Sequence, residues 1–281
     1  MTLHVLHDRG DGPPVVLLHG FPLDHRMWRS VVDALTQTAR AVSGGGAPLG
    51  PVLAADLPGA RGASLAPADH ASDAHASGAE PSLEVAADRL AAELAEAGVT
   101  RAIVVGLSMG GYVALALAER HPDLVAALGL LDTKSTADTP DARANRLDVA
   151  ERAEASGSVD PVRSMATTLV GESTRASRPD VVAQLAAWIE EQSPAGVAWS
   201  QRAMAARPDR TDVLRRFVGP VVVVVGDEDA ITPVAAAEHL VASAQDAQLV
   251  VVPRSGHMTA CEQPAVVAAA LADLVQRTAP H

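Results

Sequence analysis

Cysteine and aromatic side chains are scarce in this chain. Its 281 residues include one cysteine, three tryptophans, two phenylalanines and one tyrosine. A single cysteine excludes an internal disulfide framework. We interpret Cys261 as a small core residue and not as a nucleophile served by nearby His257, because a free cysteine usually packs as a buried apolar side chain.

Long apolar runs and basic clusters are also missing. No segment reaches the roughly 18 consecutive apolar residues of a membrane span, and the first residues do not resemble a secretory signal, so we expect a cytoplasmic protein. The formal net charge of −12 disfavours binding to nucleic acid or to an anionic membrane. We expect a small-molecule partner and a monomer or weak homodimer, and nothing in the chain requires a cofactor or a metal.

The chain does have a regular alternation of apolar strand patterns and amphipathic helix patterns. With 48% hydrophobic residues it can bury one large core, and the alternation predicts an α/β fold with a mostly parallel sheet flanked by helices. Strands are expected at 3–7, 15–18, 51–55, 102–105, 127–131, 221–225 and 249–252, with the first two paired as a hairpin. Helices are expected at 27–39, 83–97, 111–121, 234–243 and 264–278.

The most specific motif is a Gly-Leu-Ser-Met-Gly pentapeptide at 106–110, where an apolar strand breaks and an alanine-rich helix begins. Strand, tight turn and helix together form the pattern of a nucleophile elbow with Ser108 at its tip. The glycines leave room around a serine whose backbone is strained, and the hydroxyl stands at the head of a helix, where amide dipoles favour negative charge. A chance match is the alternative for the pentapeptide alone, and the flanking strand and helix argue against it.

A serine hydroxyl needs a base to remove its proton, and the chain supplies a histidine and an acid downstream. Five valines at 221–225 lead into an acidic loop that holds Asp229, and an apolar strand at 249–252 leads into a loop that holds His257. We assign His257 as the general base and Asp229 as the acid that orients it. Three other carboxylates stay open as the acid, two beside Asp229 and one at the end of the preceding strand: Asp227, Glu228 and Asp132.

A strand at 14–18 runs into a loop that begins His19-Gly-Phe21, and an Asp-Leu-Pro-Gly segment follows the strand at 51–55. With the order serine, aspartate, histidine, these segments resemble the α/β-hydrolase superfamily over nearly the whole chain. The resemblance implies an oxyanion hole made by the backbone N–H groups of Phe21 and Met109. His19 is expected to hold the oxyanion loop in place.

Within the superfamily, the chain is most similar to the branch of enol-lactonases and small esterases, which includes 3-oxoadipate enol-lactonase-like proteins. The single glycine of the oxyanion loop and the segment at 202–212 support this placement. One departure is the sequence Gly-Ala-Arg-Gly-Ala-Ser at 59–64, where relatives commonly carry Gly-His-Gly-Arg-Ser. No role of that histidine is therefore carried over to this chain.

The resemblance also implies a helical cap inserted after the sixth strand, which would shape the pocket. Helical segments at 139–156 and 179–192 fit this, and we expect a hydrolase core at 1–132 and 213–281 and a cap at 133–212. Three tryptophans of the oxyanion-loop and cap regions are candidate pocket residues, with packing as the alternative for each: Trp28, Trp188 and Trp199. Three arginines are candidates to bind a substrate carboxylate, with solvated helix faces as the alternative: Arg146, Arg202 and Arg207.

Two stretches, 41–50 and 60–81, are rich in glycine, alanine, serine and proline. The second contains two aspartates and two histidines at a spacing that permits a metal site: Asp69, His70, Asp73 and His75. A low-complexity surface loop is the interpretation that we favour.

These features predict a serine hydrolase that cleaves small carboxylic esters or lactones through Ser108, His257 and Asp229 and an acyl-enzyme. In the superfamily that the chain resembles, haloalkane dehalogenases and most epoxide hydrolases carry aspartate at the elbow. The serine of this chain therefore argues against both activities. Cofactor-free haloperoxidase-like enzymes and carbon–carbon bond hydrolases use the same residues and remain alternatives. A hydrolase-like ligand receptor or scaffold is the alternative that is not an enzyme.

Overall fold

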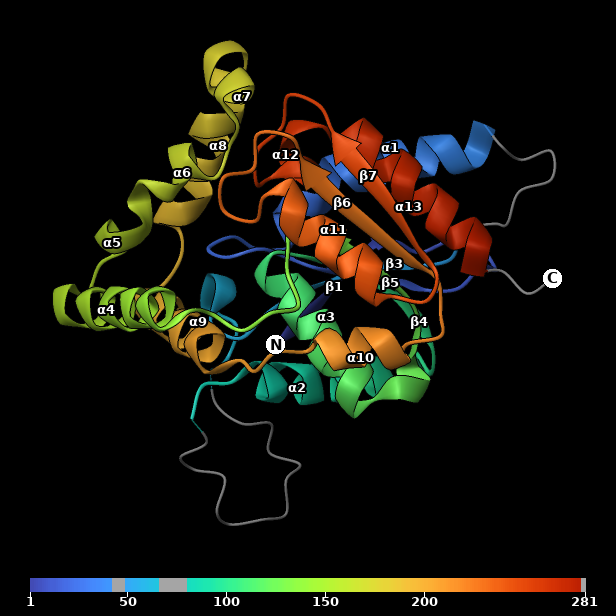
Figure 1. Ribbon diagram of the computed structural model, residues 1–281, viewed down its shortest axis with the longest axis horizontal. Helices are drawn as coiled ribbons and strands as arrows, with labels where there is room; N and C mark the ends of the chain where they lie inside the picture. Colours follow the sequence, from blue (N-terminus) through green and yellow to red (C-terminus); the bar gives the residue numbers. More distant parts are fainter. Residues whose placement is uncertain (42–48, 66–79, 279–281) are drawn as a thin grey trace.

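A twisted sheet of seven strands forms the centre of the molecule (Figure 1). The computed structural model describes residues 1–41, 49–65 and 80–278. The strand order is β1-β3-β2-β4-β5-β6-β7, and every neighbouring pair is parallel except β1 with β3. The strands are β1 (Thr2–His7), β2 (Val15–Leu18), β3 (Val52–Asp56), β4 (Ala102–Leu107), β5 (Val125–Leu131), β6 (Val221–Gly226) and β7 (Ala247–Val252).

Helices cover both faces of the sheet, as the buried apolar runs of its central strands require. On one face α1 (Arg29–Ala41) packs beside α13 (Pro264–Thr278), with the short α12 (Thr259–Glu262) at their end. On the other face α2 (Leu83–Glu96) packs beside α3 (Met109–Arg120), and α10 (Thr211–Arg216) packs beside α11 (Val234–Ser243). Three short 3-10 turns complete this part: η1 (His25–Trp28), η2 (Ala60–Gly62) and η3 (Pro122–Leu124).

Six helices lie between β5 and α10, and we call residues 140–206 the insertion. They are α4 (Pro140–Ser156), α5 (Asp160–Arg163), α6 (Met165–Thr168), α7 (Glu172–Ser177), α8 (Pro179–Glu190) and α9 (Pro194–Ala206). They form the layer on the left of Figure 1, beside the sheet. The backbone of the insertion approaches the core closely at Gly196. A Cβ on this residue would lie 2.1 Å from the carbonyl oxygen of Gly59. At another contact point, the Gln192 amide donates to Asp24, which lies in the loop after β2 (3.1 Å).

The expected α/β-hydrolase architecture is confirmed, and the observed helices and strands lie close to the expected ranges. Two details were wrong. The first two strands do not form a hairpin, because β2 lies between β3 and β4 in parallel while β1 pairs with the outer side of β3. The insertion follows the fifth strand in chain order and not the sixth, because only β1 to β4 precede β5 in the described chain. None of the described helices has the length and apolarity needed to cross a membrane.

The close packing of α3 against β2 can be tested at Gly110. A Cβ there would lie 2.2 Å from the carbonyl oxygen of Leu18, so we expect Gly110→Ala to lower the free energy of unfolding by about 3 kcal/mol or more, at the upper end of overpacking costs. Gly157→Ala is the control, because its Cβ would meet no atom within 4 Å and only the positive φ of 61° is unfavourable, at about 1–2 kcal/mol. Urea denaturation measures both, and equal losses would contradict the close approach.

Candidate active site

Ser108 occupies the turn between β4 and α3 with a strained backbone, φ 51° and ψ −111°. Its two glycine neighbours allow this turn. A Cβ on Gly106 would lie 2.2 Å from the carbonyl carbon of Gly110, so the elbow closes only where side chains are absent. Such strain persists where the surroundings determine the conformation, and it is commonly found at functional sites.

The structure brings Ser108, His257 and Asp229 into one hydrogen-bonded row. His257 Nε2 lies 2.9 Å from Ser108 Oγ, and His257 Nδ1 lies 2.8 Å from Asp229 Oδ2. The histidine and the aspartate are buried. Because an aspartate only accepts when ionised, Nδ1 carries the proton and Nε2 is free to accept from the serine hydroxyl. The arrangement can therefore remove the hydroxyl proton as the oxygen attacks.

Asp229 is held as a carboxylate by its surroundings. Its Oδ1 accepts from the backbone N–H groups of Ile231 (2.8 Å) and Thr232 (3.0 Å), and its Oδ2 accepts from the Thr232 hydroxyl (2.7 Å). Burial alone would raise the pKa of Asp229, but the hydrogen bond and charge of His257 and the bonds from Thr232 hold it below its usual value. Thr232 was missed from the sequence, where it is an ordinary loop residue three positions after the acid.

The rival acids are engaged elsewhere. Asp132 is buried and accepts from the backbone N–H (3.0 Å) and hydroxyl (2.6 Å) of Thr259. Its pKa is raised well above the usual value, mainly by burial and next by the charge of Asp229. Glu228 accepts from Ser173, outside this row. Within the described chain, Asp229 is the carboxylate that contacts His257.

Phe21 and Met109, the expected oxyanion donors, line one narrow pocket. Within the described residues neither backbone N–H donates to a protein acceptor, so both are available to a ligand. His19 holds this loop as expected: its Nε2 accepts from Leu57 N (3.0 Å), and its Nδ1 lies 3.0 Å from the carbonyl oxygen of Gly20. Burial lowers the pKa of His19, which matches a neutral ring. The rest of the pocket lining is His19, Pro22, Leu23, Gly59, Ala60, Gln192, Gly196, Val197 and Ser200.

Glu262 fixes the loop that carries His257 and was missed from the sequence. One oxygen of its buried carboxylate accepts from the backbone N–H groups of Gly256 (3.0 Å) and Met258 (3.1 Å), on either side of the histidine. The other oxygen accepts from Gly256 (3.0 Å) and from Gly171 of the insertion (2.9 Å). The carboxylate therefore joins the histidine loop to the insertion. No sequence pattern distinguishes it from a solvated glutamate on a short helix.

The three tryptophans do not belong to the pocket beside Met109. Trp28 is fully buried in the core, and its indole N–H has no acceptor among the described residues. Trp188 packs against Arg26, whose guanidinium lies 5.4 Å from the ring centre. Trp199 is buried within α9. These positions fit packing, the alternative considered for each, and a role in a substrate pocket stays a prediction.

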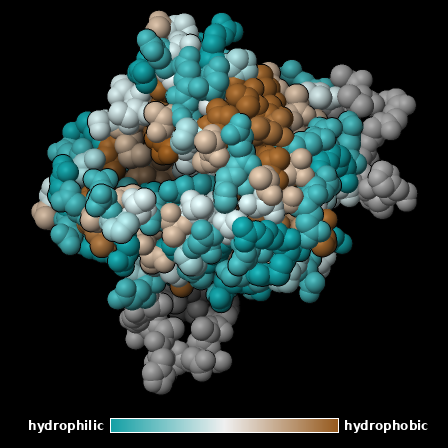
Figure 2. Space-filling model, viewed as in Figure 1, coloured by the Kyte–Doolittle hydropathy of each residue, from teal (hydrophilic) through white to brown (hydrophobic). Residues whose placement is uncertain are grey.

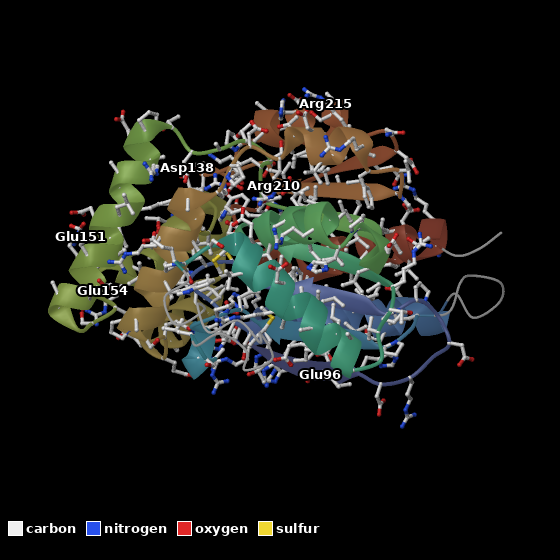
Figure 3. All side chains as sticks on the ribbon, turned by 90° about the horizontal axis from the view of Figure 1, so that it is seen from below. Glu96, Asp138, Glu151, Glu154, Arg210 and Arg215 are labelled. Carbon is white, nitrogen blue, oxygen red and sulfur yellow. The ribbon has the colours of Figure 1, made fainter. Side chains whose placement is uncertain are left out.

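The three candidate arginines each bind a carboxylate of the protein. Arg202 pairs with Glu154 at the surface of the insertion. Arg146 and Arg207 both bind Asp138, just before α4 (Figure 3). Burial alone would raise the pKa of Asp138, but the hydrogen bonds and charges of the two arginines hold it well below its usual range. Arg207 is buried, Arg146 is mostly buried, and Arg202 lies on an exposed helix face.

A cluster of His4, His25 and Asp56 brings three possible metal ligands together. Both rings hydrogen bond to the aspartate, His4 at 2.8 Å and His25 at 2.9 Å, and they stack with centroids 3.6 Å apart. An ion bound in the plane of one ring would lie out of the plane of the other, so this cluster fits a hydrogen-bonded support for the loop after β2 better than a metal centre. The metal ligands considered in the sequence, at 69–75, lie outside the described residues.

Cys261 behaves as the sequence suggested. The side chain is partly buried, and burial raises the pKa of the thiol to about 12. A thiol with such a pKa is protonated at neutral pH and is a poor nucleophile.

A nucleophile elbow on a mostly parallel sheet, with a histidine and an aspartate from later loops, is typical of the α/β-hydrolase class. The chain belongs to this family: the model of the alpha/beta hydrolase fold matches residues 13–264.

Similar proteins include several esterases. The solved structure of a thermophilic esterase from Thermogutta terrifontis, with malate bound, is 34% identical, with 98% of this chain and 93% of that chain covered and a TM-score of 0.85. A pimeloyl-[acyl-carrier protein] methyl ester esterase of Neisseria meningitidis is 28% identical over 93% of both chains. The enol-lactonase from Burkholderia xenovorans LB400 is 20% identical, with a TM-score of 0.77 over 97% of this chain and 95% of that one, and shares the fold.

The role of Glu262 gives a prediction about stability. In Glu262→Gln an amide NH₂ replaces one acceptor, so at least one backbone N–H of Gly171, Gly256 or Met258 loses its partner. We expect the free energy of unfolding to fall by about 1.5–3 kcal/mol, with faster hydrogen exchange at these amides. Glu154→Gln, which removes an exposed ion pair, is the control and should cost less than about 1 kcal/mol. Equal losses of unfolding free energy in the two variants, measured by urea denaturation, would show that the buried hydrogen bonds of Glu262 contribute no more than an exposed ion pair.

Proposed function

We propose that this protein is a serine hydrolase that cleaves small carboxylic esters or lactones through an acyl-enzyme. The observation that carries the proposal is the row of hydrogen bonds from Ser108 through His257 to Asp229, at the tip of a strained elbow. Similarity to esterases over nearly the full chain supports ester cleavage. A small-molecule substrate is the proposed partner, and a monomer or weak homodimer stays a prediction.

In the first half of the proposed reaction, the Ser108 oxygen attacks the carbonyl carbon while His257 Nε2 takes the hydroxyl proton. Asp229 keeps the other ring nitrogen protonated and stabilises the imidazolium that forms. The backbone N–H groups of Phe21 and Met109 donate to the carbonyl oxygen as it becomes negative. The imidazolium then protonates the leaving alkoxide, which departs and leaves an ester on Ser108.

In the second half, water attacks the acyl-enzyme with His257 again as the base. The proton returns to Ser108 as the carboxylic acid leaves. With a lactone, the alcohol and the acid remain parts of one product molecule. Apart from the substrate and one water molecule, the proposed steps use groups of this chain.

We further propose that residues 133–212 act as a cap over this site. Val197 and Ser200 of α9 line the same pocket as Phe21 and Met109. The backbone N–H of His257 donates to the carbonyl oxygen of Leu169 in the insertion (2.9 Å). Insertion residues therefore contact the site from two sides, and a cap in this position would exclude water and select the substrate.

Release of p-nitrophenol from acetyl, butyryl and octanoyl esters tests the chemistry. We expect Ser108→Ala to lower kcat/KM by at least about a thousandfold, because members of such a row act as a unit. Asp229→Asn should lose at least about a hundredfold, because the histidine would lose the partner that fixes its tautomer. Asp132→Asn is the comparison, with folding of all variants checked by circular dichroism.

Four outcomes would contradict the proposal or one of its assignments. A loss of less than about tenfold in Ser108→Ala would show that the serine is not the nucleophile. Normal turnover in Asp229→Asn with none in folded Asp132→Asn would move the acid to Asp132. A ligand that stabilises the protein without repeated turnover would favour a receptor or scaffold. Halogenation without ester cleavage would favour a haloperoxidase-like enzyme, and carbon–carbon cleavage without ester cleavage would favour a carbon–carbon bond hydrolase.

A further inference from the structure

A pocket of about 380 Å³ opens inside the insertion, between α4, α5, α6 and α9. Its walls are partly apolar, with Val149 of α4, Val162 of α5 and Met165 of α6. Its polar side is formed by Asn145, Arg146, Arg152 and Gln201. Arg152 is exposed and pairs with Asp148 on the same helix. Figure 2 shows apolar side chains set back between the helices of the insertion, on the left of the view. A pocket of this size with a few polar groups is of the kind that binds small molecules.

Positive charge exceeds negative charge beside this pocket. Asp138 binds three cations at once: Arg146 (2.6 Å), Arg207 (2.7 Å) and Lys134 (3.2 Å). One carboxylate neutralises only one of them, so the cluster has a net charge of +2 in a chain whose net charge is −12. Arg207 is buried, whereas the Arg146 side chain keeps 22% of its surface exposed. Arg146 is therefore the arginine of this cluster that a ligand can reach from the pocket.

Arg146 has hydrogen-bond donors to spare. Its Nε donates to Asp138, and its Nη1 donates to Gln201 Oε1 (3.3 Å) and contacts the sulfur of Met204 (3.3 Å). Its Nη2 has no acceptor among the residues that the structure describes. Two contacts fix the guanidinium in place while its remaining edge stays available, and a fixed guanidinium binds a carboxylate with little loss of side-chain freedom.

Three connections link this pocket to the elements around Ser108. Gln201 follows Ser200, which lines the pocket of the expected oxyanion donors. Met165 lies four residues before Leu169, whose carbonyl oxygen binds the backbone N–H of His257.

The third connection runs through the cation cluster itself. The Arg207 guanidinium lies 4.0 Å from the ring centre of Tyr112, which is one helical turn after Ser108 on α3. The cluster therefore rests directly on the helix that follows the elbow. The helices α9, α6 and α3 therefore each link a wall of the Arg146 pocket, or the cation cluster beside it, to residues of the candidate site.

We propose that Arg146 binds a carboxylate at the far end of the substrate, so that the preferred substrates are anionic esters with a short aliphatic spacer. The inference rests on the proposed ester cleavage at Ser108. The apolar walls accept the spacer and the free edge of Arg146 accepts the carboxylate. That carboxylate belongs either to the acyl part, as in a half-ester of a dicarboxylic acid, or to the alcohol part.

The proposal can be tested by measuring rates of ester hydrolysis in a pH-stat. Monomethyl esters of dicarboxylic acids from succinate to suberate carry the carboxylate on the acyl side, and 6-acetoxyhexanoate carries it on the alcohol side. The neutral comparisons are the matching dimethyl esters and the methyl ester of 6-acetoxyhexanoate. We expect one anionic series to have a KM at least about tenfold lower than its neutral partners, the size of one hydrogen bond to a charged group.

The variants are Arg146→Gln, Arg146→Lys and Arg202→Gln. Arg146→Gln should remove the preference for the anionic ester and leave kcat/KM for neutral esters within about twofold, because Asp138 keeps Arg207 and Lys134 as partners. Arg146→Lys should keep part of the preference through its charge. Arg202→Gln, which removes an exposed ion pair with Glu154 on the same insertion, should keep all of it.

Turnover of neutral esters without a preference for either anionic series would overturn the carboxylate site and leave ester cleavage intact. Equal losses for anionic and neutral esters in Arg146→Gln would also overturn it, because Arg146 would then act on the fold. If no ester is turned over, the carboxylate site can still be tested apart from catalysis. Calorimetry then measures the binding of monomethyl adipate and of 6-acetoxyhexanoate to Ser108→Ala. Binding of either that Arg146→Gln abolishes would support the site without the proposed activity, and no binding of either would overturn both.

Discussion

The strained backbone of Ser108 is the constraint on which the rest of the site depends. A positive φ at a serine is unfavourable by about 1–2 kcal/mol, and it persists because β4 and α3 meet where Gly106 and Gly110 have no side chains. Gly110 in turn packs against the carbonyl oxygen of Leu18 at the end of β2. The same contact brings the loop with Phe21 to the serine. Close backbone packing at Gly106 and Gly110 therefore positions both the nucleophile and the loop of one expected oxyanion donor.

Buried carboxylates hold the loops that carry the other groups. Asp229 binds His257 directly, Asp132 binds the backbone and hydroxyl of Thr259 just beyond it, and Glu262 binds the amides on either side of it. Each buried carboxyl group accepts from several N–H or O–H donors, which offsets the cost of removing it from water. The histidine loop is thus fixed by carboxyl groups from three directions, while Nε2 of the ring faces the Ser108 hydroxyl.

Much of this was predictable because it is local in sequence. The elbow around Ser108 and the chain order to Asp229 and His257 follow from short patterns of strand, glycine and loop. The pairing of β1 with β3 depends on the order of strands across the whole sheet. Gly171, one partner of Glu262, and Gln201, one partner of Arg146, lie far away in sequence. A single sequence records that a charge is present, but its partner is set by tertiary packing, so these contacts required the structure.

The insertion joins the core through contacts that differ in kind from those of the sheet. The sheet is fixed by continuous backbone pairing and fully buried strands such as β6. The insertion is attached by single contacts, such as Gly171 to Glu262 and Gln192 to Asp24. A cluster of three cations, Lys134, Arg146 and Arg207, lies where the insertion joins the core, so an overall acidic protein has a local excess of positive charge there.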